Sequence, residues 1–216
     1  MTAAPRLPEV AIRSARREEA ELAAVLLYES VKGMGDYMFG CEARWSVPET
    51  LAELFRSRQN RLSHEYASLA EVEGQVAGLL MSYPGKAVPP LDLQTGRTLM
   101  GFFSLGALLR MAWRSLGLSG TEALRGEYYI SNLAVLPTER GRGIGSRLLA
   151  FAEGQARAAG FTRLSLCVDM DNTGAQRLYR RMGYQVVRTQ YYPRHAAQAG
   201  RGYLRMVKPL DSQPAS

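Results

Sequence analysis

The sequence has few cysteines and no segment that could enter a membrane. Its two cysteines, Cys41 and Cys167, stand far apart and form no metal-binding pattern, which is typical of a protein from a reducing cytoplasm. The first ten residues lack the apolar core of a secretion signal. The longest mostly apolar run, residues 98–109, is too short to span a bilayer. We therefore expect a cytoplasmic protein that needs neither a membrane nor a metal ion.

Lysine is also rare, and the positive charge comes from arginine. The formal net charge is +7, and among the 27 basic residues only Lys32, Lys86 and Lys208 are lysines. An arginine bias spread over a chain rich in Ala, Leu and Gly is weak evidence for nucleic-acid binding. An anionic small ligand explains a local arginine cluster more economically. We expect no nucleic-acid partner, and a basic RNA- or partner-binding protein stays as an alternative.

The length and composition fit one globular domain. The chain has 216 residues, of which 46% are hydrophobic, and this is enough to bury a full core. The Pro-, Ala- and Ser-rich ends, residues 1–8 and 211–216, are expected to be flexible. Residues 9–210 are then the domain, with no internal repeat.

Hydrophobic periodicity predicts a hairpin early in the chain and strand–helix–strand units late. Strands are expected at residues 10–14, 66–73, 76–83, 128–135, 163–168, 184–191 and 203–208. Helices are expected at 17–30, 48–58, 146–159 and 172–182, with a loop or broken helix at 31–46. A long insert at 85–126 is Pro- and Gly-rich at first and looks helical over 98–118. This order predicts an α/β (α+β) fold with a mixed sheet rather than a fully parallel one.

The run Arg140-Gly141-Arg142-Gly143-Ile144-Gly145 stands between an expected strand and an expected helix. A glycine-rich turn there exposes backbone N–H groups at a helix N-terminus, where the helix dipole favours an anion. A Walker A loop would need Gly-Lys-Ser/Thr, and the dinucleotide fingerprint spaces its glycines differently. The run could be a plain tight turn, but with its arginines it predicts a site for a phosphorylated ligand.

Two motifs in the second half resemble those of the GNAT superfamily of N-acetyltransferases. The turn fits the pattern Arg/Gln-x-x-Gly-x-Gly through Arg140, Gly143 and Gly145. The later pattern Asn-x-x-Ala-x-x-Leu-Tyr-x-x-x-Gly-Tyr is matched by Asn172, Ala175, Leu178, Tyr179, Gly183 and Tyr184. The motifs come in the right order, and the match covers about residues 127–187. The resemblance implies a mostly antiparallel central sheet of six to seven strands flanked by helices, with the helical insert before the central strand.

The resemblance also implies acetyl-CoA, or a related acyl-CoA, as the acyl donor, and no metal. The turn would wrap the pyrophosphate through Arg140, Gly141, Arg142, Gly143, Ile144, Gly145 and Ser146. The preceding strand would offer the backbone groups of Leu133, Ala134 and Val135 to the pantetheine arm, as an added strand would. Asn172 is the family-matched contact to this cofactor, although it serves equally well as a helix cap.

Transfer to an amine needs a neutral nucleophile and a proton for the departing thiolate, because an alkyl ammonium has a pKa of about 10.4. The resemblance gives Tyr179 the role of proton donor, and a core tyrosine is the alternative. Glu127, which opens the central strand, is the first candidate for the base, with a water-relayed or missing base as the alternative. Some relatives carry a glutamate where this chain has Cys167, and Asp169 shares that strand face. Cys167 itself is expected to be a buried strand residue rather than a nucleophile.

The acceptor is the part of the function that the sequence leaves most open. The insert could be a lid over the acceptor pocket, a homodimer contact or core packing. Apolar walls suit an acceptor with apolar parts or a peptide end, and no acid cluster indicates a polyamine site. The leading hypothesis is direct acetyl transfer from acetyl-CoA to a primary amine of a small molecule, peptide or protein. The alternative of the same fold is a module that binds acetyl-CoA with weak catalysis.

Overall fold

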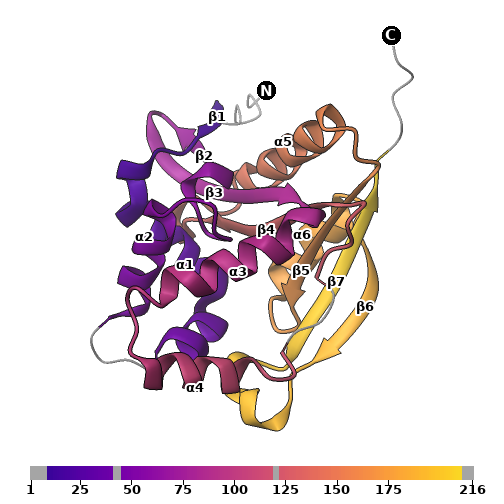
Figure 1. The fold of residues 1–216 in the computed structure, drawn as a ribbon. Helices are drawn as coiled ribbons and strands as arrows, with labels where there is room; N and C mark the ends of the chain where they lie inside the picture. Colours follow the sequence, from indigo (N-terminus) through magenta and orange to yellow (C-terminus); the bar gives the residue numbers. More distant parts are fainter. Residues whose placement is uncertain (1–8, 41–44, 119–121, 211–216) are drawn as a thin grey trace, which may run out of the picture.

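A computed structural model describes residues 9–40, 45–118 and 122–210, and a seven-stranded sheet forms its centre (Figure 1). The strand order is β1 (Val10–Ser14), β2 (Ala67–Val72), β3 (Gln75–Pro84), β4 (Tyr128–Val135), β5 (Arg163–Asp169), β7 (Gly202–Pro209) and β6 (Gln185–Tyr191). Every neighbouring pair is antiparallel except β4 and β5. The mixed, mostly antiparallel sheet predicted from the sequence is confirmed. The ends predicted to be flexible, 1–8 and 211–216, lie outside the described residues.

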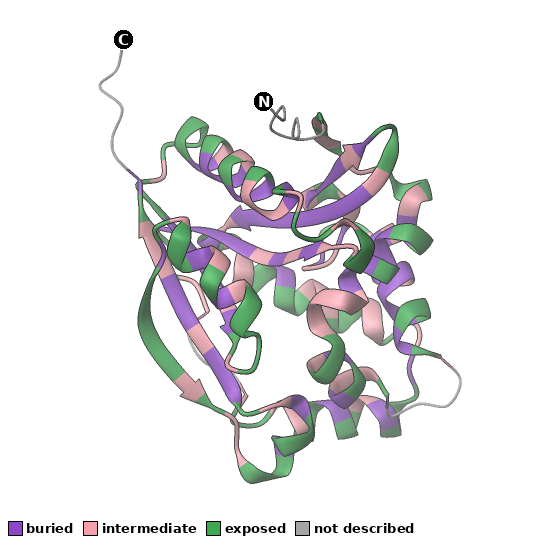
Figure 2. Cartoon of the chain, turned by 180° about the vertical axis from the view of Figure 1, so that it is seen from behind, coloured by how far each residue is buried: buried purple, intermediate pink, exposed green. Residues whose placement is uncertain are grey.

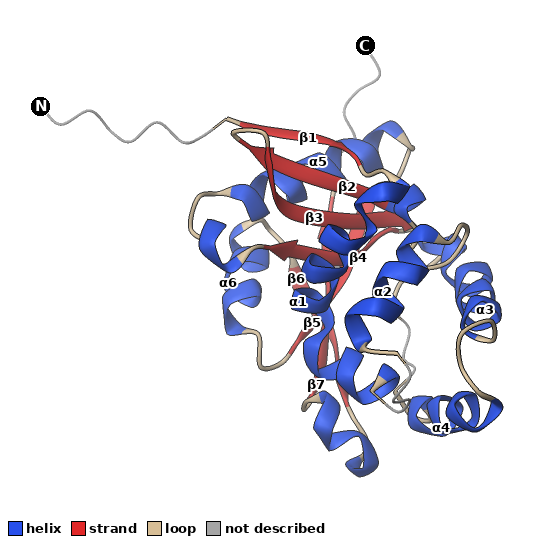
Figure 3. Cartoon of the chain, turned by 90° about the vertical axis from the view of Figure 1, so that its left-hand side faces the viewer, coloured by secondary structure: helices blue, strands red, loops and turns tan. Residues whose placement is uncertain are grey.

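Helices cover both faces of the sheet. α1 (Ala20–Phe39) and α2 (Val47–Arg56) lie on one face, and α5 (Ile144–Ala158) and α6 (Thr173–Arg181) lie on the other (Figure 3). The alternation along β3 accounts for this, because Leu79 and Met81 pack with α1 and α2 while Leu80 packs with α5. The edge strand β6 is largely exposed beside the buried β7 (Figure 2). No helix in the described part of the chain combines the length and hydropathy needed to cross a bilayer.

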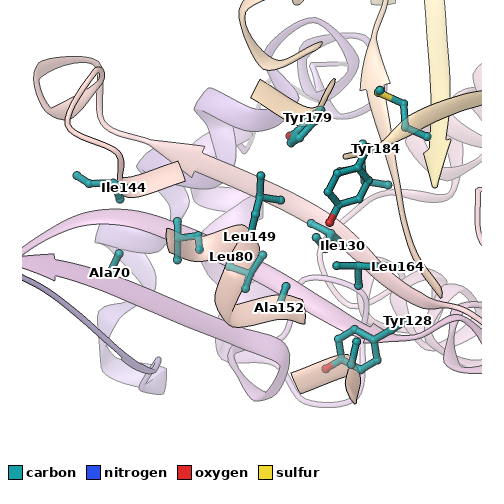
Figure 4. Packing of buried hydrophobic residues seen from close by; sticks show 14 of the residues in the cluster. Ala70, Leu80, Tyr128, Ile130, Ile144, Leu149, Ala152, Leu164, Tyr179 and Tyr184 are labelled. Carbon is teal, nitrogen blue, oxygen red and sulfur yellow. The ribbon is translucent and has the colours of Figure 1, made fainter. Parts of the chain in front are cut away.

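The core on the α5 face extends to α6. Figure 4 shows Leu80, Ile130 and Leu149 in the middle of this core and Tyr179 and Tyr184 at one side of it. The two tyrosine rings lie 5.9 Å apart, and Tyr184 is 2% exposed. Gly183, which ends α6 with a φ of +89°, turns the chain so that Tyr184 can fill this place. The packing therefore fixes the position of the helix that carries Tyr179.

α1 is longer than the sequence predicts. It runs to Phe39, so the loop or broken helix expected at 31–46 was wrong for residues 31–39. Gly33 and Gly35 suggested a break, since a glycine inside a helix costs about 1 kcal/mol. A Cβ at Gly33 would lie 3.3 Å from the carbonyl oxygen of Ala199, so this glycine lets the segment η5 (Arg194–Ala199) approach the helix closely. Tertiary packing outweighs the helix propensity here.

The insert contains two helices, α3 (Val88–Leu99) and α4 (Leu105–Ser115), rather than one helical stretch over 98–118. α3 begins in the Pro-rich part because prolines are accepted in the first turn of a helix. α4 begins after Ser104, whose hydroxyl accepts a hydrogen bond from the N–H of Ala107 at 3.3 Å. Ala107 and Met111 are buried near the end of α1, so part of the insert serves core packing. The lid and the homodimer contact stay predictions.

Candidate functional site

A gap opens between β4 and β5. These strands pair only through residues 128–130 and 164–166. The register between β3 and β4 shifts at this point, because Met81 lies opposite Asn132 while the next residue of β3 lies opposite Ile130. Ser131 is therefore the extra residue of a β-bulge, and a bulge bends the strand that carries it. Beyond the bulge, no strand in the described part of the chain pairs with β4 on its β5 side.

The gap exposes one edge of β4. The N–H of Leu136, just after β4, donates to the carbonyl oxygen of Ala77 in β3 at 2.9 Å. Alternate residues of a strand direct their hydrogen-bonding groups to opposite edges, so Leu133 and Val135 direct theirs away from β3 and into the gap. This edge can pair with an extended chain that enters the gap.

The glycine turn leaves free amides at the start of α5. Gly141 and Gly143 have φ values of +82° and +79°, which glycine adopts without strain. The N–H of Arg147 donates to the carbonyl of Gly143 at 3.1 Å, and no group among the described residues accepts from the amides of residues 143–146. A Cβ at Gly141 or Gly143 would meet nothing within 4 Å, so the space above the turn is open. Free amides at the positive end of a helix form an anion site.

The gap and the turn line a single cavity of about 510 Å³, here called the first cavity. Every site residue predicted from the sequence lines it except Arg142 and Glu127. The predicted residues that it unites are Leu133, Ala134, Val135, Arg140, Gly141, Gly143, Ile144, Gly145, Ser146, Asn172 and Tyr179. The expected constellation thus forms one continuous site.

Arg140 supplies positive charge to the first cavity. Its Nε donates to the carbonyl of Val135 at 3.2 Å and its Nη2 donates to Glu29 at 3.1 Å, while 58% of its side chain is exposed. Hydrogen bonding from Lys32, together with the charge of Arg140, holds the pKa of Glu29 below its usual range. Arg142 instead forms an ion pair with Glu139. Of these two arginines, Arg140 is the one placed to meet an anion in the cavity.

Tyr179 has a buried ring and a hydroxyl without a protein partner. The residue is 6% exposed and lines the first cavity, and no group in the described part of the chain forms a hydrogen bond with its hydroxyl. Burial raises the pKa of Tyr179 to about 12. The hydroxyl is therefore protonated at neutral pH and can donate a hydrogen bond into the cavity.

Asn172 caps α6. Its Oδ1 accepts a hydrogen bond from the N–H of Ala175 at 3.0 Å, which is the geometry of an N-cap. Asn172 also lines the first cavity. The cap fixes the direction of the helix that presents Tyr179. Asn172 therefore acts as a helix cap whether or not it also contacts a ligand.

Glu127 lies at the far end of β4 and lines neither cavity. It is 2% exposed, forms a buried ion pair with Arg205, and accepts the N–H of Leu124 at 2.9 Å. Although burial opposes the effect, the hydrogen bond from Arg205 holds its pKa below the usual range. This carboxylate connects β4, β7 and the end of the insert through its hydrogen bonds. Because it lines neither cavity, the structure gives it no access to a reacting amine.

A second cavity of about 700 Å³ adjoins the first. Both are lined by Glu29, Ser30, Cys167, Asp169 and Asn172. The second cavity also contains Glu122 and Asp171, so four carboxylates line it. Three of them are paired with cations: Glu29 with Lys32 and Arg140, Glu122 with Arg61, and Asp171 with Arg201 at 3.5 Å. These acids come from α1, from the end of the insert and from the end of β5, and only the folded chain brings them together. The one available signal was that Asp169 shares a strand face with Cys167.

Cys167 lies where the two cavities meet, but it is not activated. Burial raises the pKa of its thiol to about 12, so the thiol is protonated at neutral pH. Its Sγ contacts the carbonyl oxygen of Glu122 at 3.9 Å. This agrees with the prediction of a strand cysteine rather than a nucleophile. Within the described residues, no group of three or more His, Cys, Asp or Glu side chains could hold a metal ion.

The sequence matches a known protein family and part of a curated relative. The model of the acetyltransferase (GNAT) family matches residues 36–184. The aminoalkylphosphonate N-acetyltransferase of Salmonella typhimurium is 46% identical over 56 residues, which are 26% of this chain. The aligned part spans 36% of the length of that curated relative.

Solved structures match nearly the whole chain. The crystal structure of an acetyltransferase superposes with a TM-score of 0.68 at 26% identity, covering 93% of this chain and 100% of that one. An N-acetyltransferase from Staphylococcus aureus gives a TM-score of 0.68 at 23% identity, covering 91% of this chain and 99% of that one. The second likeness, at this identity, shows the fold alone.

Proposed function

The chain belongs to the acetyltransferase (GNAT) family, and from that membership we propose that it transfers the acetyl group of acetyl-CoA directly to a primary amine of a small molecule or peptide. One observation carries the proposal: the first cavity unites an open strand edge, free amides at a helix N-terminus and the hydroxyl of Tyr179. The name of the Salmonella relative, an N-acetyltransferase, supports the same chemistry.

The residues of the first cavity fit acetyl-CoA, which supplies an activated acetyl thioester. The free amides of residues 143–146 and the guanidinium of Arg140 match the charge of a diphosphate. The N–H and C=O groups of Leu133 and the N–H of Val135 match the amides of a pantetheine arm, which pairs as an added strand. The carbonyl of Val135 already accepts a hydrogen bond from Arg140 at 3.2 Å. The thioester end then lies toward Tyr179 and the second cavity.

We assign the base to Asp169 in place of Glu127. Asp169 lines both cavities, and its carboxylate accepts the N–H of Asp171 at 2.8 Å. No cationic side chain of the described residues lies within ion-pair distance of it. A free carboxylate between the two cavities can hold an ammonium and take the proton that the amine must lose before it attacks.

Leu133 and Tyr179 stabilise the charges that develop during transfer. The N–H of Leu133 donates to the carbonyl oxygen as negative charge builds on it, an effect that is worth roughly 3 kcal/mol in other enzymes. The hydroxyl of Tyr179 donates a hydrogen bond to the departing sulfur. One ammonium proton passes to Asp169 before the amine attacks. When the C–N bond has formed, the C–S bond breaks, the nitrogen loses its second proton to solvent, and the CoA thiolate takes up a proton from solvent. The protein forms no bond with the acetyl group.

A thermal-shift titration combined with a CoA-release assay tests this function. Acetyl-CoA at a hundred times its Kd should stabilise the folded chain by about 2.7 kcal/mol, which raises Tm by roughly 5–10 °C. Pantetheine, which lacks the diphosphate, should give a much smaller shift. A shift without CoA release from any amine would favour the weakly catalytic module. No shift at millimolar acetyl-CoA would refute the proposal and favour a partner- or RNA-binding role for the basic surface.

A further inference from the structure

Helix α4 of the insert carries apolar side chains on its outward face as well as on its buried face. Ala107 and Met111 are buried in a cluster near the end of α1. Leu105, Leu109 and Trp113 follow one another at every fourth residue, so they share one face of the helix, opposite to that of Ala107 and Met111. These three side chains are 73%, 62% and 58% exposed. The outward face of a surface helix is normally polar, so this face calls for a partner.

More exposed apolar side chains gather beside this face. Among the described residues, twelve large hydrophobic side chains are exposed, and six of them lie between residues 93 and 116. Figure 3 shows α3 and α4, which carry most of them, at one side of the molecule. Such a concentration marks an interaction site rather than chance exposure. The six residues, here called the insert surface, are Leu93, Met100, Leu105, Leu109, Trp113 and Leu116.

The charge around the insert surface has one sign. No Asp or Glu occurs in residues 93–121, nor in residues 185–210, which include η5. Arg97 of α3 and Arg194 of η5 are exposed, and neither forms an ion pair with a described side chain. The insert surface therefore combines apolar side chains with positive charge that the described part of the protein leaves available.

Contacts within the protein hold α4 and Trp113 in place. The guanidinium of Arg114 donates to the carbonyl oxygen of Tyr37 at 2.5 Å and lies over the ring of the same residue, 5.2 Å from its centroid. The ring of His195 in η5 lies 4.9 Å from the ring of Trp113, which places the charge of η5 beside the end of α4. The insert surface is thus formed before a partner binds, and a preformed surface loses less conformational entropy on binding.

These features match an anionic membrane surface rather than a second copy of the chain. Helices that lie in the membrane interface direct leucine and tryptophan toward the lipid and basic residues toward the headgroups. A second copy would bring its own Arg97 and Arg194 to the contact, without acids from the same segments, so like charges would meet. The expectation of no membrane partner rested on the lack of a segment long enough to span a bilayer, and a helix that lies on the surface needs no such segment.

We propose that the insert surface docks the protein on an anionic phospholipid membrane, with the outward side chains of α4 at the boundary of the acyl chains and with Arg97 and Arg194 at the phosphates. The contact is peripheral and reversible, because one helix face and a few arginines give only modest membrane affinity. Ser115 and Leu118, at the end of α4 and just beyond it, line the second cavity. Docking therefore brings the proposed acceptor site near the lipid surface.

Co-sedimentation of the full chain with vesicles tests the proposal. The vesicles contain phosphatidylcholine alone or phosphatidylcholine with about 30% phosphatidylglycerol. We expect about tenfold stronger binding to the anionic vesicles, and most of this preference should disappear in about 0.5 M NaCl, because salt screens the arginines. The tryptophan emission should shift to shorter wavelength on binding, since Trp113 leaves water. No binding to the anionic vesicles, or equal binding to the neutral ones, would overturn the proposal.

Four variants locate the contact. Leu109→Gln and the control Leu22→Gln each replace an exposed helical leucine by a residue of similar helix propensity, and Leu22 lies on α1 outside the insert. Leu109→Gln should weaken vesicle binding about tenfold, and Leu22→Gln should not change it. Arg97→Gln should lower the preference for anionic vesicles about fivefold, and Trp113→Phe should abolish most of the emission shift. Equal vesicle binding by Leu109→Gln and Leu22→Gln would refute the role of α4.

Two further measurements separate the proposal from its alternatives. Analytical ultracentrifugation without lipid should give the parent and Leu109→Gln the same mass, and a dimer that Leu109→Gln converts to a monomer would show that a second copy covers the insert surface and overturn the proposal. CoA release with soluble amines should be unchanged in Leu109→Gln, because Leu109 lines neither cavity. Docking and acetyl transfer can therefore fail independently.

Discussion

Replacing Tyr179 by phenylalanine removes one hydroxyl from the first cavity and leaves the packing of its ring in place. The ring belongs to the core, 5.9 Å from the ring of Tyr184, and the hydroxyl has no hydrogen-bond partner among the described residues. The substitution therefore breaks no contact within the described protein. Any loss of activity must come from a contact that the hydroxyl makes with the substrates.

The size of the loss follows from the pKa of Tyr179. Burial raises this pKa to about 12, while a thiol such as that of CoA has a pKa of about 8.5. Complete transfer of the phenol proton to the thiolate is then uphill by roughly 5 kcal/mol. A hydrogen bond to a charged group needs no such transfer and is worth about 1.5–3 kcal/mol. We expect kcat to fall roughly 10- to 100-fold, since each 1.36 kcal/mol is a factor of ten.

Initial rates of CoA release and the Kd of acetyl-CoA, measured on the same preparation, check this reasoning. The Kd should change by less than about threefold, because the hydrogen bond to sulfur strengthens only as charge develops. Tyr184→Phe is the matched control, since its hydroxyl is also buried without a described partner but lines neither cavity. A kcat of Tyr179→Phe within threefold of the parent, or an equal loss in Tyr184→Phe, would refute the role of Tyr179.

Three further results are expected. Gly143→Ala and Gly160→Ala both place alanine at a φ near +80°, so each should lower the unfolding free energy by about 1–2 kcal/mol. Only Gly143→Ala should weaken acetyl-CoA binding, by about tenfold in calorimetry. Equal affinity in both variants would contradict the anion site. Glu127→Gln leaves Arg205 without its buried partner and should lower the unfolding free energy by about 3 kcal/mol in urea titrations. A large loss of kcat in the folded variant would instead show that Glu127 acts as a base. The raised pKa of Tyr203, about 12 against about 10 when unfolded, adds stability that is complete below pH 10 and lost between pH 10 and 12; a Tm that stays constant over this interval would contradict the burial.

The sequence predicted the strands well, and most of the site residues it named lie together in the first cavity, because local patterns determine both. β1 and β4 begin and end where the alternation of apolar residues predicts. The left-handed conformations at Gly141 and Gly143 and the end of α6 at Gly183 follow from the freedom of glycine in short segments. Residues within one strand–turn–helix unit lie close in space whatever the rest of the chain does.

The predictions from the sequence were wrong or incomplete where contacts between distant segments of the chain determine the structure. Glu127 looked available as a base because nothing nearby in the chain reveals that Arg205 neutralises it. The length of α1 was misjudged because Gly33 reads as a break until Ala199 is seen against it. The acids of the second cavity come from three segments, at residues 29, 122 and 169–171, so no local pattern could have united them.

The end of β5 is the point at which the proposed function brings its two substrates together. β4 and β5 run parallel, so their C-terminal ends lie at the same edge of the sheet. The bulge at Ser131 turns β4 away there, and the end of β5 then faces the first cavity on one side and the second cavity on the other. Cys167 is the thiol at this junction, and a pKa of about 12 keeps it protonated, which agrees with the proposed direct transfer without an acetylated cysteine. Under the proposed function, an amine held at Asp169 is the nucleophile at this junction.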